Sequence, residues 1–401
     1  MNNKSYLIIA CASIVILLSM GVRQSFGLFQ TPIAQTFGIG LAAFSLSLAI
    51  QNLLWGLSQP FIGALADKFG SGRIIALSAI AQVIGLLVLA NATSIWELHL
   101  GVGVIIGIAG SGTTWAVLLA VVARNVPENR RSFFFGLTSA MGTGGQIIIA
   151  PINQISINTF GWVDTIFMLS ILLITIVPLA YVLRGKAPNS SVRQEAADTL
   201  SAALNKARKH SGYLFLTAGF FVCGFHVMFI MAHLPTYLTT ELQLAAWLPG
   251  TAISVIGATN LIGTVFFGWL GDKYSKKYLL STIYFLRSVT MAGFIAFPAS
   301  EISVLVFCFF IGFLWLSTVP LTNGLVGQIF GIKYLATLGG IVFASHQVGS
   351  FVSVWIGGWL FDLTQSYMVI WQVAILLGII AAVLHLPIKD KPVSETATQA
   401  A

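Results

Sequence analysis

The first side chain in this sequence that could do chemistry is Arg23, which interrupts an apolar run at residues 5–29. A guanidinium among apolar side chains needs a partner, and its planar fork matches a carboxylate through two parallel hydrogen bonds. Gln24 stands next to it and adds an amide. If the partner of Arg23 is a ligand, that ligand is an anion. The alternatives are a structural carbonyl or hydroxyl partner, or a side chain that extends toward water.

Three more polar side chains, His226, His233 and Tyr237, share a second apolar run. Their spacings of seven and four residues place them along one stripe of a helix. Histidine titrates near neutral pH, so the pair is suited to proton coupling or to hydrogen bonding with a carboxylate. A structural role at a helix interface is the alternative. His346 precedes Gly349 in another apolar run, where close packing is as good an interpretation as ligand contact.

The sequence lacks the motifs that several other kinds of chemistry require. It contains no G-x-x-x-x-G-K-[ST] phosphate loop and no G-x-S-x-G nucleophile elbow, so ATP-driven pumping and acyl transfer are unsupported. Cys11, Cys223 and Cys308 lie in apolar runs without metal-ligand spacing, which favours packing over a disulfide or a zinc site. The net charge of +8 comes from short basic clusters, so nucleic-acid binding is not expected. We expect no enzyme, no cofactor and no metal.

The elements that position these side chains follow from composition. The chain is 57% hydrophobic and only 8% charged, against about 25% charged in soluble domains, so most of its surface must face lipid. A helix needs about 20 apolar residues to cross a bilayer core. Twelve such runs are predicted, at 5–29, 42–66, 73–91, 97–123, 132–157, 163–184, 211–239, 247–271, 278–298, 302–328, 335–361 and 368–387. We expect an all-α membrane protein with 12 transmembrane helices.

The only long polar stretch, residues 185–210, divides the chain into an N-terminal bundle of six helices at 1–184 and a C-terminal bundle at 211–401 with a short tail. Such a linker is typical of a duplicated transporter. Apart from Arg23 and Arg287, every Lys and Arg falls on the side of the membrane that holds this linker. Basic residues are retained on the cytoplasmic side. We therefore predict a multi-pass protein of the cell (inner) membrane with both termini and the linker in the cytoplasm.

The two halves repeat each other. The segment 63–70, GALADKFG, returns as GWLGDKYS at 268–275, and its aspartate recurs 205 residues later. Glu97 and Glu301, each at the start of a fourth run, are 204 residues apart. A shared offset over two kinds of landmark indicates a duplication. The same offset relates Arg287 to Gln82, and polar residues at both positions favour a packing role for Arg287.

The segment GALADKFGSGR at 63–73 resembles the signature loop of the major facilitator superfamily. Twelve spans, a central linker and a second copy of the loop agree with this resemblance, which implies the major facilitator fold and two six-helix pseudo-repeats. In that family the loop acts as a latch between conformations, whereas a simple topology anchor is the alternative. The latch residues that the resemblance implies are Gly63, Asp67, Lys68, Gly70, Arg73, Gly268, Asp272 and Lys273. We expect Gly63 to allow close helix approach.

Finer matches are similar to the monocarboxylate-porter branch of that family, including its bacterial members. They are GVRQSFGLFQTPI at 21–33, CGFHVMFIMAHLPTYL at 223–238, GWLGDKYSKKYLLSTIYFLRS at 268–288 and SHQVGSFVSVWIGGWLFD at 345–362. The resemblance implies that Arg23, where relatives often have lysine, binds the substrate carboxylate. This sequence departs from the pattern in the eighth run, where an Asp and an Arg are replaced by Asn260 and Thr264. Coupling through a buried carboxylate is therefore in doubt.

The family's substrate pathway is surrounded by the first, fourth, seventh and tenth helices, which implies further candidates for substrate contact. With the residues named above, the set comprises Arg23, Gln24, Trp115, His226, His233, Tyr237, Asn260, Asn323 and His346. Serine and threonine residues of these runs also satisfy helix carbonyls in lipid, and Gln51 and Asn52 fit either role.

Two classes of function remain. The first is a secondary carrier that uses alternating access to move a small, monocarboxylate-like organic anion, with or without protons, as a monomer in the lipid bilayer. An exporter of drugs, siderophores or other amphiphilic compounds is its competitor, because the chain is 12% aromatic. The second class is a membrane receptor or sensor. A sensor usually carries a soluble output domain, and only a short tail follows the last run, so transport is favoured.

Overall fold

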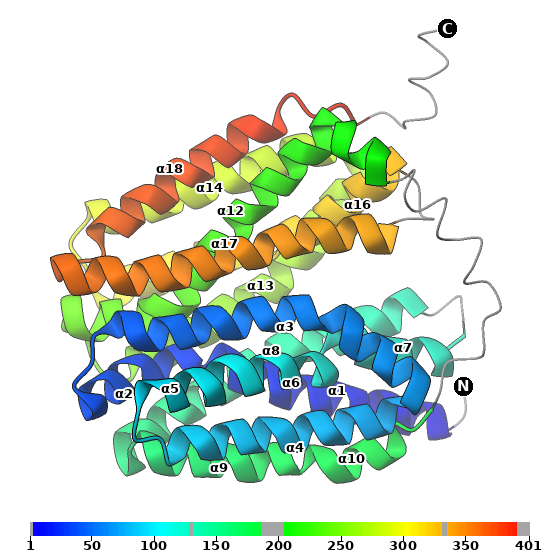
Figure 1. Ribbon diagram of the computed structural model, residues 1–401. Coiled ribbons are helices and arrows are strands. Elements are labelled where there is room, and N and C mark those ends of the chain that lie inside the picture. The colour runs from blue at the N-terminus through cyan, green and yellow to red at the C-terminus, as the bar shows by residue number, and fades with distance from the viewer. Residues whose placement is uncertain (1–2, 128–130, 186–203, 331–334, 391–401) are drawn as a thin grey trace, which may run out of the picture. The chain divides into compact units, whose positions relative to one another are not determined.

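The computed structural model describes residues 3–127, 131–185, 204–330 and 335–390. Every regular element in these ranges is a helix (Figure 1). Most of the predicted linker, residues 186–203, lies outside the described residues, as does the tail at 391–401.

The first half of the chain folds into helices that follow the predicted runs. They are α1 (Asn3–Gln24), η1 (Phe26–Phe29), α2 (Gln30–Phe37), α3 (Leu41–Phe69), α4 (Ser71–Ala90), α5 (Ile95–Leu98), η2 (His99–Ile106), α6 (Gly107–Gly110), η3 (Ser111–Thr113), α7 (Trp115–Asn125), α8 (Arg131–Phe160), α9 (Trp162–Ile174) and α10 (Ile176–Val182). Three glycines with positive φ separate neighbouring helices: Gly38 at 60° ends α2, Gly70 at 100° stands between α3 and α4, and Gly161 at 86° stands between α8 and α9.

The second half is built in the same way. Its helices are α12 (Ser211–Thr236), η6 (Tyr237–Glu241), α13 (Leu248–Lys273), α14 (Lys276–Ala296), α15 (Glu301–Phe313), α16 (Thr318–Phe330), α17 (Leu335–Thr364) and α18 (Met368–His385). Serine caps open two helices that follow short loops. Ser94 begins α5 and Ser300 begins α15, each through a capping box.

Eleven stretches of the described residues are helices long and apolar enough to cross a membrane. They coincide with 11 of the predicted runs. The remaining run, at 132–157, is the helix α8, which carries buried amide side chains at Gln146, Asn153 and Gln154. The predicted all-helical membrane fold is confirmed.

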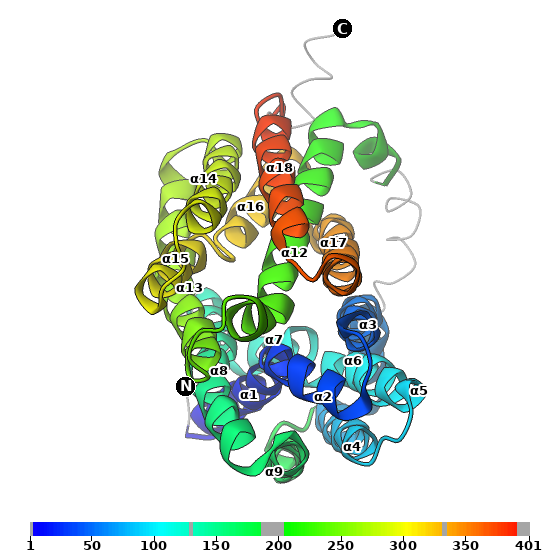
Figure 2. The same cartoon turned by 90° about the vertical axis from the view of Figure 1, so that its left-hand side faces the viewer.

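Contacts between residues divide the chain into two compact units. The first consists of Met1–Ala187, Met228–Ala258 and Phe351–Tyr367, and the second of Pro188–Val227, Thr259–Ser350 and Met368–Ala401. In the first unit α1 packs along α8, and α4 along α9 and α10; in the second, α14 packs along α18 (Figures 1 and 2).

Glycines allow the tightest of these pairings, between α1 and α8. A Cβ atom at Gly21 would lie 2.8 Å from the carbonyl oxygen of Gly145, and a Cβ atom at Gly145 would collide with the carbonyl oxygen of Leu17. The two backbones therefore meet directly beside Arg23. This pairing fixes the last turn of α1.

The tenth span is broken between α15 and α16, at residues 314–317. Arg287 of α14 is only 1% exposed and donates to the carbonyl oxygen of Leu314 from Nε at 3.1 Å and from Nη2 at 2.8 Å, and also to the carbonyl oxygen of Trp315. Asn260 of α13 accepts the backbone N–H of Leu316 at 3.0 Å. Three of the four residues of the break thus find partners from two other helices, and a lipid environment requires such partners.

The fourth span has a matching irregularity. Gln82 of α4 donates to Thr113 of η3 at 2.8 Å. The repeat offset therefore places a polar side chain of the third or ninth span against a break in the next span. The expectation that Arg287 packs helices together agrees with this geometry.

Replacement of Arg287 by Met should destabilise the protein by about 3 kcal/mol, because buried carbonyl groups at the break lose charge-assisted donors. Unfolding in mixed detergent micelles measures the change. Lys4→Gln, at an exposed position of α1, is the control and should change little. An Arg287→Met protein as stable as the wild type would contradict the role of this side chain.

Candidate functional site

Arg23 lies in the last turn of α1, immediately before the chain changes from an α-helix to the 3₁₀-helix η1. Ser25 ends the helix because its N–H bonds to the carbonyl oxygen of Val22 at 3.2 Å and its hydroxyl to the same oxygen at 2.9 Å. Asn153 of α8 donates to the Ser25 hydroxyl at 2.6 Å. The irregularity beside Arg23 is therefore held from within α1 and from α8.

The guanidinium of Arg23 rests on α3. Its central carbon is 3.9 Å from the ring centroid of Trp55, a cation–π distance, and its Nη2 donates to Oδ1 of Asn52. Asn52 in turn donates from Nδ2 to the carbonyl oxygen of Leu48 at 2.8 Å, which directs Oδ1 toward the arginine. Asn52 and Trp55 are 2% and 4% exposed. Their spacing of three residues puts both on one face of α3.

The fourth span completes this cluster. Thr114 has an extended backbone between η3 and α7, and its hydroxyl accepts the indole N–H of Trp55 at 3.1 Å. Trp115, the first residue of α7, is half-buried and lies 5.7 Å from Trp55 between ring centroids. We call Arg23, Asn52, Trp55, Thr114 and Trp115 the arginine cluster. It draws on the first, second and fourth spans, all within the first compact unit.

No carboxylate in the described part of the chain balances the charge of the arginine cluster. Among the described residues the ion pair found is that of Arg124 with Asp67, and no carboxylate pairs with Arg23. The Nε atom of Arg23 is buried without a hydrogen-bond partner. A cation with an unused donor in an apolar span is costly unless a counter-charge arrives. The cluster is therefore chemically suited to an anion. Gln24 is half-buried beside it.

The seventh-span residues His233 and Tyr237 lie elsewhere, in an aromatic group with Tyr367. His233 is fully buried, and its Nε2 is 2.8 Å from the carbonyl oxygen of Val354. A carbonyl oxygen only accepts, so Nε2 carries the hydrogen and Nδ1 accepts the hydroxyl of Tyr367 at 3.1 Å. The Tyr237 ring meets Tyr367 edge-on at 5.9 Å. Both ring nitrogens of His233 have protein partners, which favours the structural alternative.

His226 and His346 belong to the second compact unit. Nε2 of His226 donates to the carbonyl oxygen of Ala374 on α18 at 2.7 Å, and the side chain is 1% exposed. His346 is 7% exposed and stacks on Phe343 with ring centroids 5.5 Å apart. Asn260 accepts the N–H of Leu316 at the break in the tenth span. These three expected ligand residues have protein contacts, whereas Asn323 on α16 is exposed.

The signature loop, residues 63–73, contains an ion pair and lacks the close helix approach that the sequence predicted. Asp67 pairs with Arg124 of α7 at 3.3 Å, and Arg124 also donates to Ser71. The close helix approach expected at Gly63 is not found, because a Cβ atom there would meet no atom within 4 Å. This part of α3 faces outward, and nearby Phe61 is 71% exposed.

The remaining residues of the two loop copies are accounted for as follows. Gly70 needs its glycine because of its φ of 100°. Arg73 and Asp272 are exposed, and the ammonium groups of Lys68 and Lys273 lie over the rings of Phe69 and Trp269 at 5.1 and 3.9 Å. Gly268, like Gly63, has no atom within 4 Å of an added Cβ.

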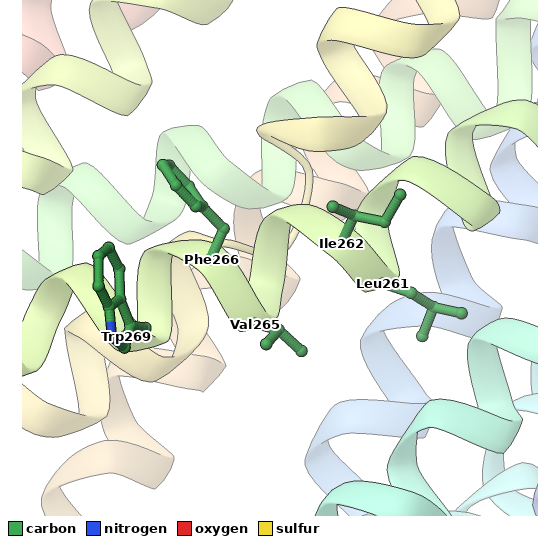
Figure 3. A pocket seen from close by; sticks show the side chains of 5 residues that line it. All are labelled: Leu261, Ile262, Val265, Phe266 and Trp269. Atoms are coloured by element: carbon green, nitrogen blue, oxygen red, sulfur yellow. The ribbon is translucent and has the colours of Figure 1, made fainter.

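A hollow of about 740 Å³ lies along α13, lined by Leu261, Ile262, Val265, Phe266 and Trp269 (Figure 3). Ile262 and Val265 are 61% and 74% exposed. A surface of this composition suits lipid chains and offers nothing to an anion.

Sequence reasoning missed Trp55, the residue that places the guanidinium. The signal available was its spacing of three from Asn52, which puts an amide and an indole on one face of the second span. Nothing in the sequence relates that face to Arg23, because the contact joins residues that lie far apart along the chain.

Comparison with known proteins agrees with the fold. The family model described as Major Facilitator Superfamily matches residues 12–342. The chain is 26% identical to the uncharacterized MFS-type transporter YcxA of Bacillus subtilis, over 92% of this chain and 91% of that one. It is 25% identical to monocarboxylate transporter 13 of Rattus norvegicus, over 89% and 82%. A D-xylose-proton symporter has the same fold, with a TM-score of 0.75 at 16% identity over 97% and 99% of the two chains.

The family match covers most of the chain, and the structure supplies the helices that this family requires. The protein therefore belongs to the Major Facilitator Superfamily and is a multi-pass membrane transporter rather than an enzyme.

Proposed function

We propose that this protein is a secondary active carrier that moves a small organic anion, of the monocarboxylate class, by alternating access. The observation that carries this proposal is Arg23, a cation in an apolar span with no carboxylate partner among the described residues and a buried, unused Nε. The similarity to a protein named a monocarboxylate transporter supports the same substrate class. In this proposal the carrier lies in the cell (inner) membrane and both of its termini face the cytoplasm. A monomer is the transporting form.

Each member of the arginine cluster has a part in this proposal. Trp55 holds the guanidinium over its ring, and Asn52 accepts one hydrogen from Nη2. The remaining N–H groups are left for the two oxygens of a carboxylate. The half-buried ring of Trp115 provides an apolar wall for the rest of the substrate. Binding then replaces an unbalanced charge by a neutral pair, and the paired substrate stays bound while the carrier changes the side to which it is open.

Proton coupling, if present, does not use a carboxylate beside Arg23. Asn260 occupies the position where the related carriers have an acidic residue, and here it accepts a backbone N–H. His233 has both nitrogens engaged. The proton must therefore travel on the substrate, on another group, or be replaced by a counter-substrate.

The first prediction concerns ligand binding by the purified protein. A monocarboxylate at 100 times its Kd should stabilise the wild type by about 2.7 kcal/mol, and Arg23→Gln should abolish this gain because the counter-charge is lost. Arg23→Lys keeps the charge and should retain weaker binding. Thermal unfolding against monocarboxylates, dicarboxylates, siderophores and cationic drugs measures the effect. Stabilisation by amphiphilic compounds alone, equal in the wild type and Arg23→Gln, would favour the exporter and refute the anion site.

The second prediction concerns Trp55. Trp55→Leu removes the aromatic face beneath the guanidinium and should weaken binding of the most stabilising monocarboxylate about tenfold, in line with a cation–π energy of about 1–2 kcal/mol. Trp55→Phe keeps an aromatic face but loses the hydrogen bond to Thr114, and should weaken binding less. Isothermal titration compares the Kd values. Equal affinity in Trp55→Leu and the wild type would remove Trp55 from the site.

The third prediction concerns the signature loop as a conformational latch. Asp67 is 56% exposed in its pair with Arg124, so Asp67→Asn should change stability by less than about 1 kcal/mol. The Asp67→Asn protein should nevertheless transport its substrate several-fold more slowly, with the Kd of the substrate unchanged. The reason is that the loop acts on the conversion between the two conformations of the carrier. Uptake into proteoliposomes and binding in detergent are compared. An unchanged rate would leave the loop as a topology anchor.

A further inference from the structure

The face of α3 that carries part of the arginine cluster also carries an amide that the protein leaves unused. Asn52 and Trp55 of this face contact Arg23. Gln59 follows Trp55 by four residues, one turn nearer the signature loop. Spacings of three, four and seven residues put these three α3 side chains on one stripe of the helix. The Gln59 side chain is half-buried, and its Nε2 atom is buried with no hydrogen-bond partner among the described residues.

The backbone of α3 is irregular in the same turn. Pro60 follows Gln59 inside the helix. Proline has no N–H, so the carbonyl oxygen of Gly56 loses its usual helical donor. The amide of Gln59 and the carbonyl of Gly56 therefore both need partners that α3 itself does not supply, and lipid does not supply them either.

The first span contributes a further unused polar group. Ser19 lies four residues before Arg23, so both side chains fall on one face of α1. Ser19 is 2% exposed, and its hydroxyl has no hydrogen-bond partner among the described residues. Serine hydroxyls inside helices often bond to the preceding turn, as Ser170 does to the carbonyl oxygen of Ile166 at 2.9 Å. Because Ser19 makes no such bond, its hydroxyl is available to a ligand.

Ser19 and Gln59 are displaced from the arginine cluster in the same direction. α1 and α3 are consecutive spans, joined through η1 and α2, and they run antiparallel (Figure 1). A step back along α1 and a step forward along α3 therefore lead toward the same end of the two helices. A rise of 1.5 Å per residue places Gln59 about 6 Å from Trp55 along the helix axis. A second polar point thus lies about 6 Å from the level of the guanidinium.

We propose that the site at Arg23 takes a monocarboxylate that carries a carbonyl or hydroxyl oxygen at its far end, and that Gln59 selects this distal oxygen. The proposal rests on the anion carrier function given above and narrows its substrate class. The carboxylate pairs with Arg23, and the distal oxygen accepts a hydrogen from Nε2 of Gln59. A hydroxyl in the same place also bonds to Ser19.

The distance between the two polar points sets the length of the substrate. Each carbon–carbon bond of an extended chain advances about 1.25 Å, given a bond length of about 1.52 Å and an angle of about 111°. A distance of about 6 Å then corresponds to about four or five bonds. The distal oxygen therefore belongs on the fifth or sixth carbon, counted from the carboxylate carbon, rather than on the second.

An ordered water held by Gln59 and Ser19 is the competing interpretation, because buried waters satisfy polar groups of this kind. The two interpretations differ in selectivity. A site that hydrogen-bonds a substrate group discriminates against an analogue without that group, since the polar group of the site is then left buried and unpaired. A water that stays in place gives no such discrimination.

The test compares three ligands of the purified full-length protein, namely hexanoate, 2-oxohexanoate and 5-oxohexanoate. Isothermal titration measures their Kd values. In the wild type we expect 5-oxohexanoate to bind about tenfold more tightly than hexanoate, the effect of one hydrogen bond to a buried donor. 2-Oxohexanoate should bind no more tightly than hexanoate, because its extra oxygen lies beside the carboxylate. Equal affinity for hexanoate and 5-oxohexanoate would overturn the proposal, and this comparison needs no variant.

Matched variants assign the discrimination to Gln59. Gln59→Leu keeps the approximate size of the side chain and removes its amide, so the advantage of 5-oxohexanoate should disappear while hexanoate still binds. The stability of this variant without ligand should not fall, because no protein hydrogen bond of the Gln59 amide is lost.

Gln51→Leu is the control. Gln51 also has a buried Nε2 without a partner among the described residues, but its backbone packs against the fourth span, where a Cβ atom on Gly107 would lie 3.0 Å from the carbonyl oxygen of Gln51. This variant should keep the wild-type preference for 5-oxohexanoate. A preference that persists in Gln59→Leu, or that is lost equally in Gln51→Leu, would overturn the role of Gln59.

The same titrations separate this proposal from the carrier function on which it rests. Arg23→Gln should lose all three ligands. Failure of every ligand to bind the wild type would refute the anion site, and the distal-oxygen proposal with it. Equal binding of all three to the wild type, abolished in Arg23→Gln, would leave the anion site standing and refute the distal-oxygen proposal alone.

Discussion

Lipid offers no hydrogen bonds, so every polar group of a membrane-spanning segment must find its partner within the protein or in a ligand. This constraint explains most of the polar geometry seen here. The break between α15 and α16 exposes backbone groups, and Arg287 and Asn260 satisfy them. At the irregularity in the fourth span, Gln82 of α4 donates a hydrogen bond to Thr113. At these two breaks another helix supplies the missing donor or acceptor.

The two arginines within the membrane spans, Arg23 and Arg287, show how one residue type serves two purposes. Arg287 is engaged by the carbonyl groups of the tenth span and is 1% exposed, so its donors are used by the fold. Arg23 has an aromatic face and a single amide as partners, and its Nε is unused. The first arrangement is complete without a ligand. The second leaves a charge that only an anion balances, and this difference, rather than the presence of arginine, points to the substrate.

The carboxylates follow the same logic at the helix ends. Glu241 and Asp362 both accept N–H groups from the start of a helix, where the backbone lacks acceptors of its own. Glu241 joins segments of one sequence half, whereas Asp362 joins segments of both. A transporter that alternates between two states must break bonds of the second kind.

The sequence by itself determined the membrane class, the helical spans, the internal repeat and the family, because hydropathy and the signature loop are local properties of the chain. It also identified Arg23 as the cation to explain, and its anion role stays a prediction. Only the tertiary structure decided which partners these side chains have. The roles of Trp55, His233 and Asp362 depend on contacts with residues far away in sequence, and the open space at Gly63 depends on how α3 packs against other helices. Such contacts depend on how helices pack, and helix packing is not encoded in any single segment.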